Sequence, residues 1–229
     1  MIYLDHNATT PLLPQVKETL KELFGEEYGN PSSPYHTGRR ARDLLEESRH
    51  RLAELLGAKP SELIFTSGGS EGNNMVLRQL LFREDPGHLL VSSVEHPSVL
   101  ETAKWLTRKN NLSLGILPVD QSGKVPEASM EAAVQPETCF ISVMAANNET
   151  GTVQPFRELA GIARERQVPF HSDCVQYAGK CELDLESSGL NYATLTAHKL
   201  GGPKGIGLLY IREGSPFSPL ITGGGQERS

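Results

Sequence analysis

Cysteine is scarce in this chain, and the three residues present are poorly suited to a structural role. Cys139, Cys174 and Cys181 form an odd set and lack the paired spacing of a zinc site. Neither a disulfide framework nor a metal centre is therefore predicted. Free thiols persist in reducing compartments, so we expect the chain in the cytoplasm.

Long apolar runs and an excess of basic charge are also missing. No segment approaches 18 consecutive apolar residues, and residues 1–5 lack the basic and apolar regions of a signal peptide. The formal net charge is −6, and the arginines from Arg39 to Arg42 are followed by Glu46 and Glu47 on the same expected helix. We therefore expect neither a membrane nor a nucleic-acid partner.

The chain does contain a regular alternation of strand and helix patterns. Strands are expected at residues 3–4, 62–66, 88–93, 113–119, 139–146 and 168–173, with a hairpin between 208–212 and the segment that ends at Lys199. Helices are expected at 14–23, from the turn at 30–34 to Gly57, and at 67–82, 97–109, 125–133 and 156–166. This order predicts one α/β domain over residues 1–229, with a doubly wound, mostly parallel sheet and helices on both faces.

Lys199 is the residue whose chemistry best explains the pattern around it. It follows an apolar run that ends at Thr196 and His198, and it precedes the turn GGPKG at 201–205, where glycine lets the backbone approach a ligand closely. Desolvation and nearby positive charge lower the pKa of such a lysine and expose a free amine. Lys199 is therefore a candidate Schiff-base nucleophile. The alternative is a solvated surface lysine.

A second candidate, Asp173, ends the apolar strand in VPFHSDCVQYAGK. A carboxylate at the carboxyl end of a strand lies on the rim where α/β sheets bind ligands. There it can hold the protonated ring nitrogen of pyridoxal phosphate. The alternative is an aspartate that caps the N-terminus of a following helix.

The turn SGGSEGNN joins the strand at 62–66 to the next helix. Gly68 and Gly69 allow close approach of the backbone, and Ser70 places a hydroxyl beside the free N–H groups at the positive end of that helix. This combination suits a phosphate. The turn lacks the lysine of a Walker motif and the spacing of GxGxxG, so an ordinary strand-to-helix turn is the alternative.

Candidate site residues recur at the end of one expected strand after another. They are Gly69 and Ser70, Glu95 and His96, Asn147 and Asn148, Asp173 and Gln176, and Thr196 to Lys199. Independent turns are not expected to supply a phosphate cradle, an aromatic ring, an amide, an anion and an amine. Together these residues favour a pyridoxal phosphate site.

Several motifs also resemble those of a known family. They are YLDHNATTP, GNPSSPYHTGRRAR, IFTSGGSEGNN, SSVEHPSVL, NNETGTVQP, HSDCVQYAGK, TAHKLGGPKGIGLLYIR and GGGQER. Over Tyr3 to Arg228 the chain is similar to cysteine desulfurases of the iron–sulfur assembly and nitrogen-fixation type, which belong to the class V aminotransferase group of fold-type I pyridoxal phosphate enzymes. GNPSSPY also resembles selenocysteine lyases. The resemblance implies removal of sulfur from L-cysteine to give alanine, for iron–sulfur cluster assembly or other sulfur transfer.

The resemblance implies a role for each matching residue. Lys199 matches the lysine that holds the cofactor and takes the α-proton of the substrate. His96 matches the histidine stacked on the pyridine ring, which also takes part in proton transfer, and Asp173 matches the partner of the ring nitrogen. Period-2 alternation places Val175 on the same side as Asp173, where it would pack on the ring face opposite His96.

Other matches concern the polar groups of the cofactor. Gln176 and Asn148 match residues that contact the phenolic oxygen and the substrate. The phosphate ligands are matched by Gly69, Ser70, Thr196 and His198. Ser70 stands where the family usually has threonine, a change that keeps the hydroxyl.

The chain departs from the family at the sulfur-transfer step. Family members continue beyond GGGQER into a smaller domain and a loop with the catalytic cysteine, both of which we expect to be absent here. Residues 1–25 are expected on the substrate-facing side. Cys174 is the nearest substitute for the loop cysteine, but strand alternation turns it away from Asp173 toward the core.

Two interpretations remain open at this point. The chain is either the cofactor-binding part of a cysteine desulfurase or selenocysteine lyase, or a non-catalytic fragment that binds pyridoxal phosphate or serves as a scaffold. Fold-type I sites commonly borrow residues from a second subunit, so we expect a homodimer. A sulfur-acceptor or scaffold protein is a further expected partner.

Overall fold

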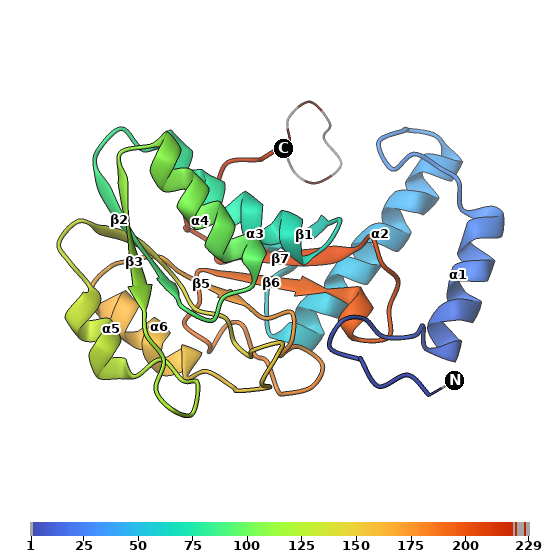
Figure 1. Ribbon diagram of the computed structural model, residues 1–229. Coiled ribbons are helices and arrows are strands. Elements are labelled where there is room, and N and C mark those ends of the chain that lie inside the picture. Colours follow the sequence, from blue (N-terminus) through green and yellow to red (C-terminus); the bar gives the residue numbers. More distant parts are fainter. Residues whose placement is uncertain (1, 222, 224–226, 228–229) are drawn as a thin grey trace.

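The computed structural model describes residues 2–221, 223 and 227 of the 229-residue chain. Within these residues a seven-stranded sheet forms the centre of the molecule, in the order β1-β7-β6-β5-β4-β2-β3 (Figure 1). The strands are β1 (Leu63–Thr66), β2 (Gly87–Ser92), β3 (Leu112–Leu117), β4 (Thr138–Ser142), β5 (Phe170–Asp173), β6 (Tyr192–Thr196) and β7 (Gly207–Ile211). Strands β2, β5 and β6 are buried at every position, as expected for strands covered on both faces.

Strand direction places most carboxyl ends on one edge of this sheet. The pairs β3–β2, β2–β4, β4–β5 and β5–β6 are parallel, whereas β7 runs antiparallel to both β6 and β1. Strand β1 therefore runs in the same direction as β6. The predicted doubly wound, mostly parallel sheet is confirmed, and so is the hairpin between β6 and β7.

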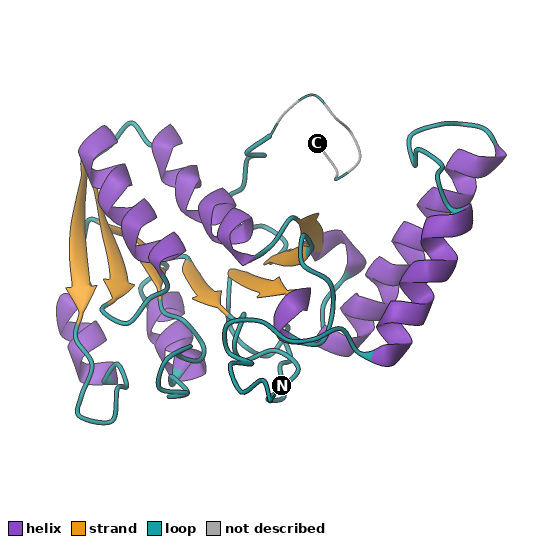
Figure 2. Ribbon diagram, turned by 45° about the vertical axis from the view of Figure 1, so that its right-hand side comes forward, coloured by secondary structure: helices purple, strands orange, loops and turns teal. Residues whose placement is uncertain are grey.

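Helices cover both faces of the sheet, as predicted (Figure 2). The four helices are α3 (Gly69–Leu77), α4 (Pro97–Lys109), α5 (Glu127–Ala133) and α6 (Phe156–Glu165). On one face α3 and α4 share an apolar core that includes Val76, Val99 and Leu106. On the other, α5 and α6 share a second core around Met130 and Phe156.

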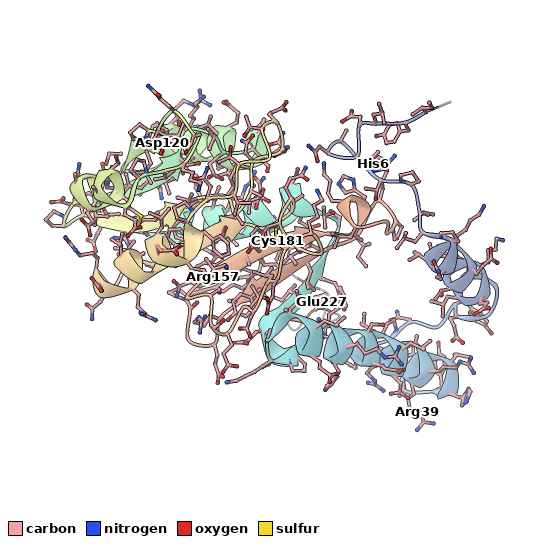
Figure 3. The ribbon with its side chains drawn as sticks, turned by 90° about the horizontal axis from the view of Figure 1, so that it is seen from below. His6, Arg39, Asp120, Arg157, Cys181 and Glu227 are labelled. Carbon is pink, nitrogen blue, oxygen red and sulfur yellow. The ribbon has the colours of Figure 1, made fainter. Side chains whose placement is uncertain are left out.

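Helices α1 (Pro14–Glu26) and α2 (His36–Leu56) extend beyond the sheet on the side away from β2 and β3 (Figure 1). Helix α2 reaches the core near its end, through Ala53. Gly57 then ends it in the left-handed conformation, with φ 59°, at the predicted residue. Figure 3 shows Arg39 near the opposite end of α2, so the arginine cluster lies on an exposed part of the helix.

The strand predicted at residues 3–4 is wrong. Tyr3 and Leu4 belong to no strand, and the Tyr3 hydroxyl donates a hydrogen bond to the Asp5 carbonyl (2.7 Å). A strand needs a neighbouring strand to satisfy its backbone groups. This segment instead runs along the turn after β6, where the Thr10 N–H donates to the His198 carbonyl (2.9 Å).

The largest boundary differences concern one strand and one helix; other predicted ends differ from the structure by one to three residues. The strand predicted at 139–146 ends as β4 at Ser142, and the chain beyond it turns so that Ala146 pairs with Val153. The helix predicted at 67–82 divides into α3 and the 3₁₀ helix η2 (Arg78–Phe82). In the described part of the chain, no helix has the length and apolar character needed to cross a membrane.

A buried arginine joins α2 to the edge strand β1. The Arg49 side chain is fully buried and donates to the Leu63 carbonyl (2.7 Å) and to both carboxylate oxygens of Glu227 (2.9 and 3.1 Å). Glu227 also accepts the N–H of Phe65 in β1 (2.8 Å). Figure 3 shows Glu227 beside α2. One carboxylate thus satisfies a buried cation and an edge-strand donor.

We expect Arg49→Met to lower the free energy of unfolding by about 2–3 kcal/mol, because it leaves the Glu227 carboxylate without its cation. Urea denaturation measures this loss. The matched control is Arg51→Met on the same helix, which removes an exposed pair with Glu47 and should change stability by about 0.5 kcal/mol or less. Equal losses in the two variants would contradict a structural role for the buried pair.

Candidate active site

One pocket of about 380 Å³ lies where the carboxyl ends of the strands meet. This volume is within the usual range of ligand pockets, roughly 300–1,000 Å³. The residues that the resemblance assigns to the cofactor site all line it: Gly69, Ser70, His96, Asn148, Asp173, Gln176, Thr196, His198 and Lys199. The candidates Glu95 and Asn147 do not line it, because both are buried behind the pocket-lining residues. Residues from five separate turns therefore share one cavity.

Asp173, the last residue of β5, is the buried anion of this pocket. One carboxylate oxygen accepts the N–H of Val175 (3.0 Å) and the other accepts the Asn73 amide (2.7 Å). Burial raises the pKa of Asp173, and these hydrogen bonds together with the charges of His96 and Lys199 oppose that rise. The chain after Asp173 forms turns rather than a helix, so the helix-cap alternative does not apply.

Lys199 ends the 3₁₀ helix η3 (Ala197–Lys199) that follows β6. Its half-buried amine donates hydrogen bonds to the backbone carbonyls of Asn7 and Ala8, the latter at 2.9 Å. Burial and the positive charge of Lys180 lower the pKa of Lys199, while the charges of Asp173 and Asp5 raise it. The net shift is downward, which favours the neutral, nucleophilic amine.

The N-terminal segment is held against the turn that contains Lys199. Thr10 Oγ1 donates to the His198 carbonyl (2.8 Å) and accepts the Gly201 N–H (2.7 Å), and Thr9 Oγ1 contacts His198 Nδ1 (3.1 Å). In Figure 3 the segment labelled at His6 passes beside this turn. These contacts fix the two carbonyl groups that bind the Lys199 amine.

His96 is the N-cap of α4 and lines the pocket from the loop after β2. Its Nδ1 atom accepts the N–H of Ser98 (3.1 Å) and lies 2.7 Å from the Ser98 hydroxyl. The preceding residue, Glu95, is buried and accepts hydrogen bonds from the Ser92 hydroxyl (2.5 Å) and the Met144 N–H (2.7 Å). Burial raises the pKa of Glu95 to about 8, so this carboxyl is largely protonated at neutral pH.

The other end of the pocket has the features of an anion site. Gly69 and Ser70 begin α3, whose first N–H groups carry the positive end of the helix dipole. Gly207 permits this arrangement, because a Cβ atom there would lie 2.7 Å from the Cα of Gly68. Thr196 and His198 complete this end of the pocket.

Gln176 is held by two neighbours. Its Oε1 atom accepts a hydrogen bond from the Lys180 amine (2.7 Å), so its Nε2 group is left to donate to the Asn7 carbonyl (2.9 Å). Asn148 donates to the adjacent Glu149 carboxylate (2.9 Å). Both amides line the pocket.

Five pocket residues were not predicted from the sequence: Asn7, Ala8, Asn73, Ser98 and Met144. Four of them lie inside quoted motifs, YLDHNATTP, SGGSEGNN and SSVEHPSVL, which was the available signal. Their side chains are common in turns and helices and indicate no particular chemistry. Only the packing of separate segments brings them to the site.

The three cysteines all lie in the described part of the chain, and none lines this pocket. Cys174 is completely buried in the core, as predicted, and burial raises its pKa to about 12. A nucleophilic thiolate is therefore not accessible at Cys174. Among the described residues there is also no group of three or more side chains able to hold a metal ion.

Comparison with known proteins decides the family. Residues 2–229 match the family model described as aminotransferase class-V. The chain belongs to this family. Class V aminotransferases, like the cysteine desulfurases, are pyridoxal phosphate enzymes.

Similar proteins include a curated cysteine desulfurase and two solved structures. The chain is 44% identical over 230 residues to the cysteine desulfurase IscS of Dictyoglomus turgidum, an alignment that covers 100% of this chain and 58% of the relative. A solved NifS-like protein has a TM-score of 0.96 and 40% identity, over 99% of this chain and 63% of its own. SspA in complex with cysteine has a TM-score of 0.95 and 37% identity, over 99% and 66%. The chain thus spans less than two thirds of the length of these proteins.

The residues present fit the family cofactor. Within the described residues no lysine, arginine or histidine forms an ion pair with Asp173, so its buried carboxylate suits a protonated ring nitrogen. The positive end of α3 suits the phosphate group of pyridoxal phosphate. The Lys199 amine suits the aldehyde carbon of the same cofactor. A Cβ atom at Gly69 would lie 2.9 Å from Val175 Cγ2, so glycine keeps this part of the cavity open.

We expect Lys180→Met to raise the pKa of Lys199, because it removes the neighbouring positive charge that disfavours the protonated amine. The pH dependence of Lys199 acylation, followed by mass spectrometry of the peptide, measures this change. Lys204→Met is the control, since it makes the same charge change at a lysine that acts on His198. The prediction would be contradicted if the pH dependence of Lys199 acylation shifted no further in Lys180→Met than in Lys204→Met.

The raised pKa of Glu95 predicts that the folded chain loses stability as the pH rises. The folded chain holds this proton up to about pH 8, whereas the unfolded chain releases it near the ordinary pKa of 4.5. Stability should therefore fall as the pH rises through this window, with a slope of up to about 1.4 kcal/mol per pH unit from this group. Urea denaturation at a series of pH values measures this dependence of the free energy of unfolding. The contribution of Glu95 should be lost in Glu95→Gln and kept in Glu158→Gln, a substitution at an exposed residue.

Proposed function

We propose that this chain carries the pyridoxal phosphate site of a cysteine desulfurase, which removes sulfur from L-cysteine and leaves alanine. The observation that supports this most is the presence of the Lys199 amine and the Asp173 carboxylate in one pocket with the N-terminus of α3. The similarity to a protein solved with cysteine supports the choice of substrate. Iron–sulfur cluster assembly is the use of the sulfur that we propose, as the resemblance of the sequence motifs implies.

The cofactor has one natural orientation in this pocket. Asp173 would hold the ring nitrogen, and Gln176 would donate its free N–H to the phenolic oxygen. The phosphate would lie at the start of α3 near Ser70, Thr196 and His198. His96 and Val175 would face the two sides of the ring, and Asn148 would contact the substrate.

The chain's own groups supply binding and proton transfer. When bound, pyridoxal phosphate withdraws electrons from the substrate Cα and makes its proton acidic. Lys199, with its lowered pKa, can take that proton as a general base. The carbonyls of Asn7 and Ala8 keep the amine at the pocket, and the N–H donors on Asp173 favour its ionised form.

Transfer of the sulfur atom requires a nucleophilic thiol. Cys174 is excluded by burial and by its high pKa, and Cys139 and Cys181 lie outside the pocket. We therefore assign the accepting thiol to none of these three cysteines. A sulfur-acceptor or scaffold protein is the partner that we propose, as the resemblance to the family implies.

Residues 1–25 belong, in this proposal, to the substrate-facing side of the site. The support is that Asn7 and Ala8 line the pocket and bind Lys199. The compartment we propose is the cytoplasm, where free thiols such as those of the three cysteines persist.

We also propose that the chain forms a homodimer. A second pocket of about 620 Å³ is mostly apolar and lies between α2 and the strands β1, β6 and β7. Phe65, Leu200 and Ile206 line it, and Leu55 beside them is 78% exposed. Contact with a second copy would remove this apolar surface from water.

Lys199→Ala provides the test of the proposed function. The unchanged chain should bind pyridoxal phosphate, turn yellow, and carry the cofactor on the Lys199 peptide after borohydride reduction. In Lys199→Ala this modified peptide should disappear, and exchange of the α-proton of L-cysteine with solvent deuterium should fall by about 10²- to 10⁴-fold. Lys204→Ala, on the same turn, should keep both properties. An unchanged chain that binds no cofactor would overturn the proposal.

A further inference from the structure

A single buried amide connects the two ring-facing groups of the pocket. Asn73 lies on α3, is fully buried, and donates from Nδ2 to the Asp173 carboxylate (2.7 Å) and to the Ser98 hydroxyl (2.8 Å). The orientation of this amide is determined, because the opposite one would place its oxygen against the carboxylate. Both hydrogens of one NH₂ group are thus used by residues of the site.

The hydrogen bond from Asn73 also determines which hydrogen bond the Ser98 hydroxyl can donate. Its hydroxyl oxygen already accepts from Asn73, so its hydrogen is free to donate to His96 Nδ1 (2.7 Å). The Ser98 backbone N–H donates to the same nitrogen (3.1 Å). With two donors directed at it, Nδ1 carries no hydrogen, and the neutral ring is protonated on Nε2.

The amide oxygen of Asn73 offers no reason of its own for an asparagine at this buried position. That oxygen is buried, and no described residue donates a hydrogen bond to it. An unsatisfied buried acceptor is unfavourable, and an apolar side chain at this position would avoid it. Asparagine at position 73 is therefore better explained by its two donated hydrogen bonds than by packing.

We propose that Asn73 is a positioning residue that directs the Asp173 carboxylate into the pocket and, through Ser98, holds His96 as the Nε2–H tautomer. This inference rests on the proposed function for the roles of Asp173 and His96. Neither Asn73 nor Ser98 transfers a proton itself. They fix the anion at the ring nitrogen and the imidazole on the ring face by one shared network.

The test compares three variants in the full chain without cofactor. Asn73→Leu removes both donated hydrogen bonds at similar volume, and Ser98→Ala removes only the hydroxyl that links Asn73 to His96, while the Ser98 backbone N–H remains. Asn74→Leu is the matched control, because Asn74 follows on the same helix but bonds Ser70 and Thr102. NMR of the Asp173 carboxyl carbon follows its titration, and NMR of the His96 ring nitrogens reports the tautomer at alkaline pH.

In the unchanged chain we expect a single His96 tautomer, protonated on Nε2. Asn73→Leu should raise the pKa of Asp173, because the Asn73 hydrogen bond lowers it, and should also disturb the His96 ring signals. Ser98→Ala should disturb only His96, and Asn74→Leu neither group. A proton on Nδ1 in the unchanged chain, or equal Asp173 titrations in Asn73→Leu and Asn74→Leu, would overturn the inference.

Cofactor binding separates this inference from the proposed function. Asn73→Leu should weaken pyridoxal phosphate binding about tenfold relative to Asn74→Leu, as expected for the loss of a hydrogen bond to a charged group. If the unchanged chain bound no pyridoxal phosphate, the proposed function would fail while the NMR result still decided the network. If Asn73→Leu does not fold, the inference is tested by the His96 tautomer in the unchanged chain and by the change in the His96 ring signals in Ser98→Ala.

Discussion

The burial of the Asp173 carboxylate is the constraint on which the rest of the site depends. A buried anion is costly unless hydrogen bonds and an opposite charge compensate it. Two N–H donors hold this carboxylate at the end of β5, and it lines the pocket without an ion pair among the described residues. The site is consequently organised to receive a cation, and the ring nitrogen of the family cofactor is one.

The direction of the strands explains why the positive end of α3 and the Lys199 amine lie near Asp173. Because β7 is antiparallel to β1 and β6, the turn into α3 and the turn that contains Lys199 follow strands of the same direction. Gly68 and Gly207 approach closely enough that a Cβ atom on Gly207 would not fit. The positive end of α3, the Lys199 amine and Asp173 are thereby placed around one cavity.

The N-terminal segment completes the site although it belongs to no strand. Its threonines bind the turn after β6, and its carbonyl groups bind the Lys199 amine. Carbonyl groups accept hydrogen bonds without adding a full negative charge, so they hold the amine without strongly favouring its protonated form. Burial and Lys180 then lower the pKa of Lys199.

The amino-acid sequence by itself determined the alternation of strands and helices and the residues with distinctive chemistry. Lys199, Asp173 and the turn at Gly69 were recognisable because a reactive amine, a strand-end carboxylate and a glycine-rich helix start each leave a local pattern. Tertiary structure alone decided that Asn73 joins Asp173 to Ser98 and that Asn7 meets Lys199. It also decided that residues 3–4 form no strand. The physical reason is that hydrogen bonds between side chains distant in sequence depend on the packing of whole elements, which no local pattern encodes.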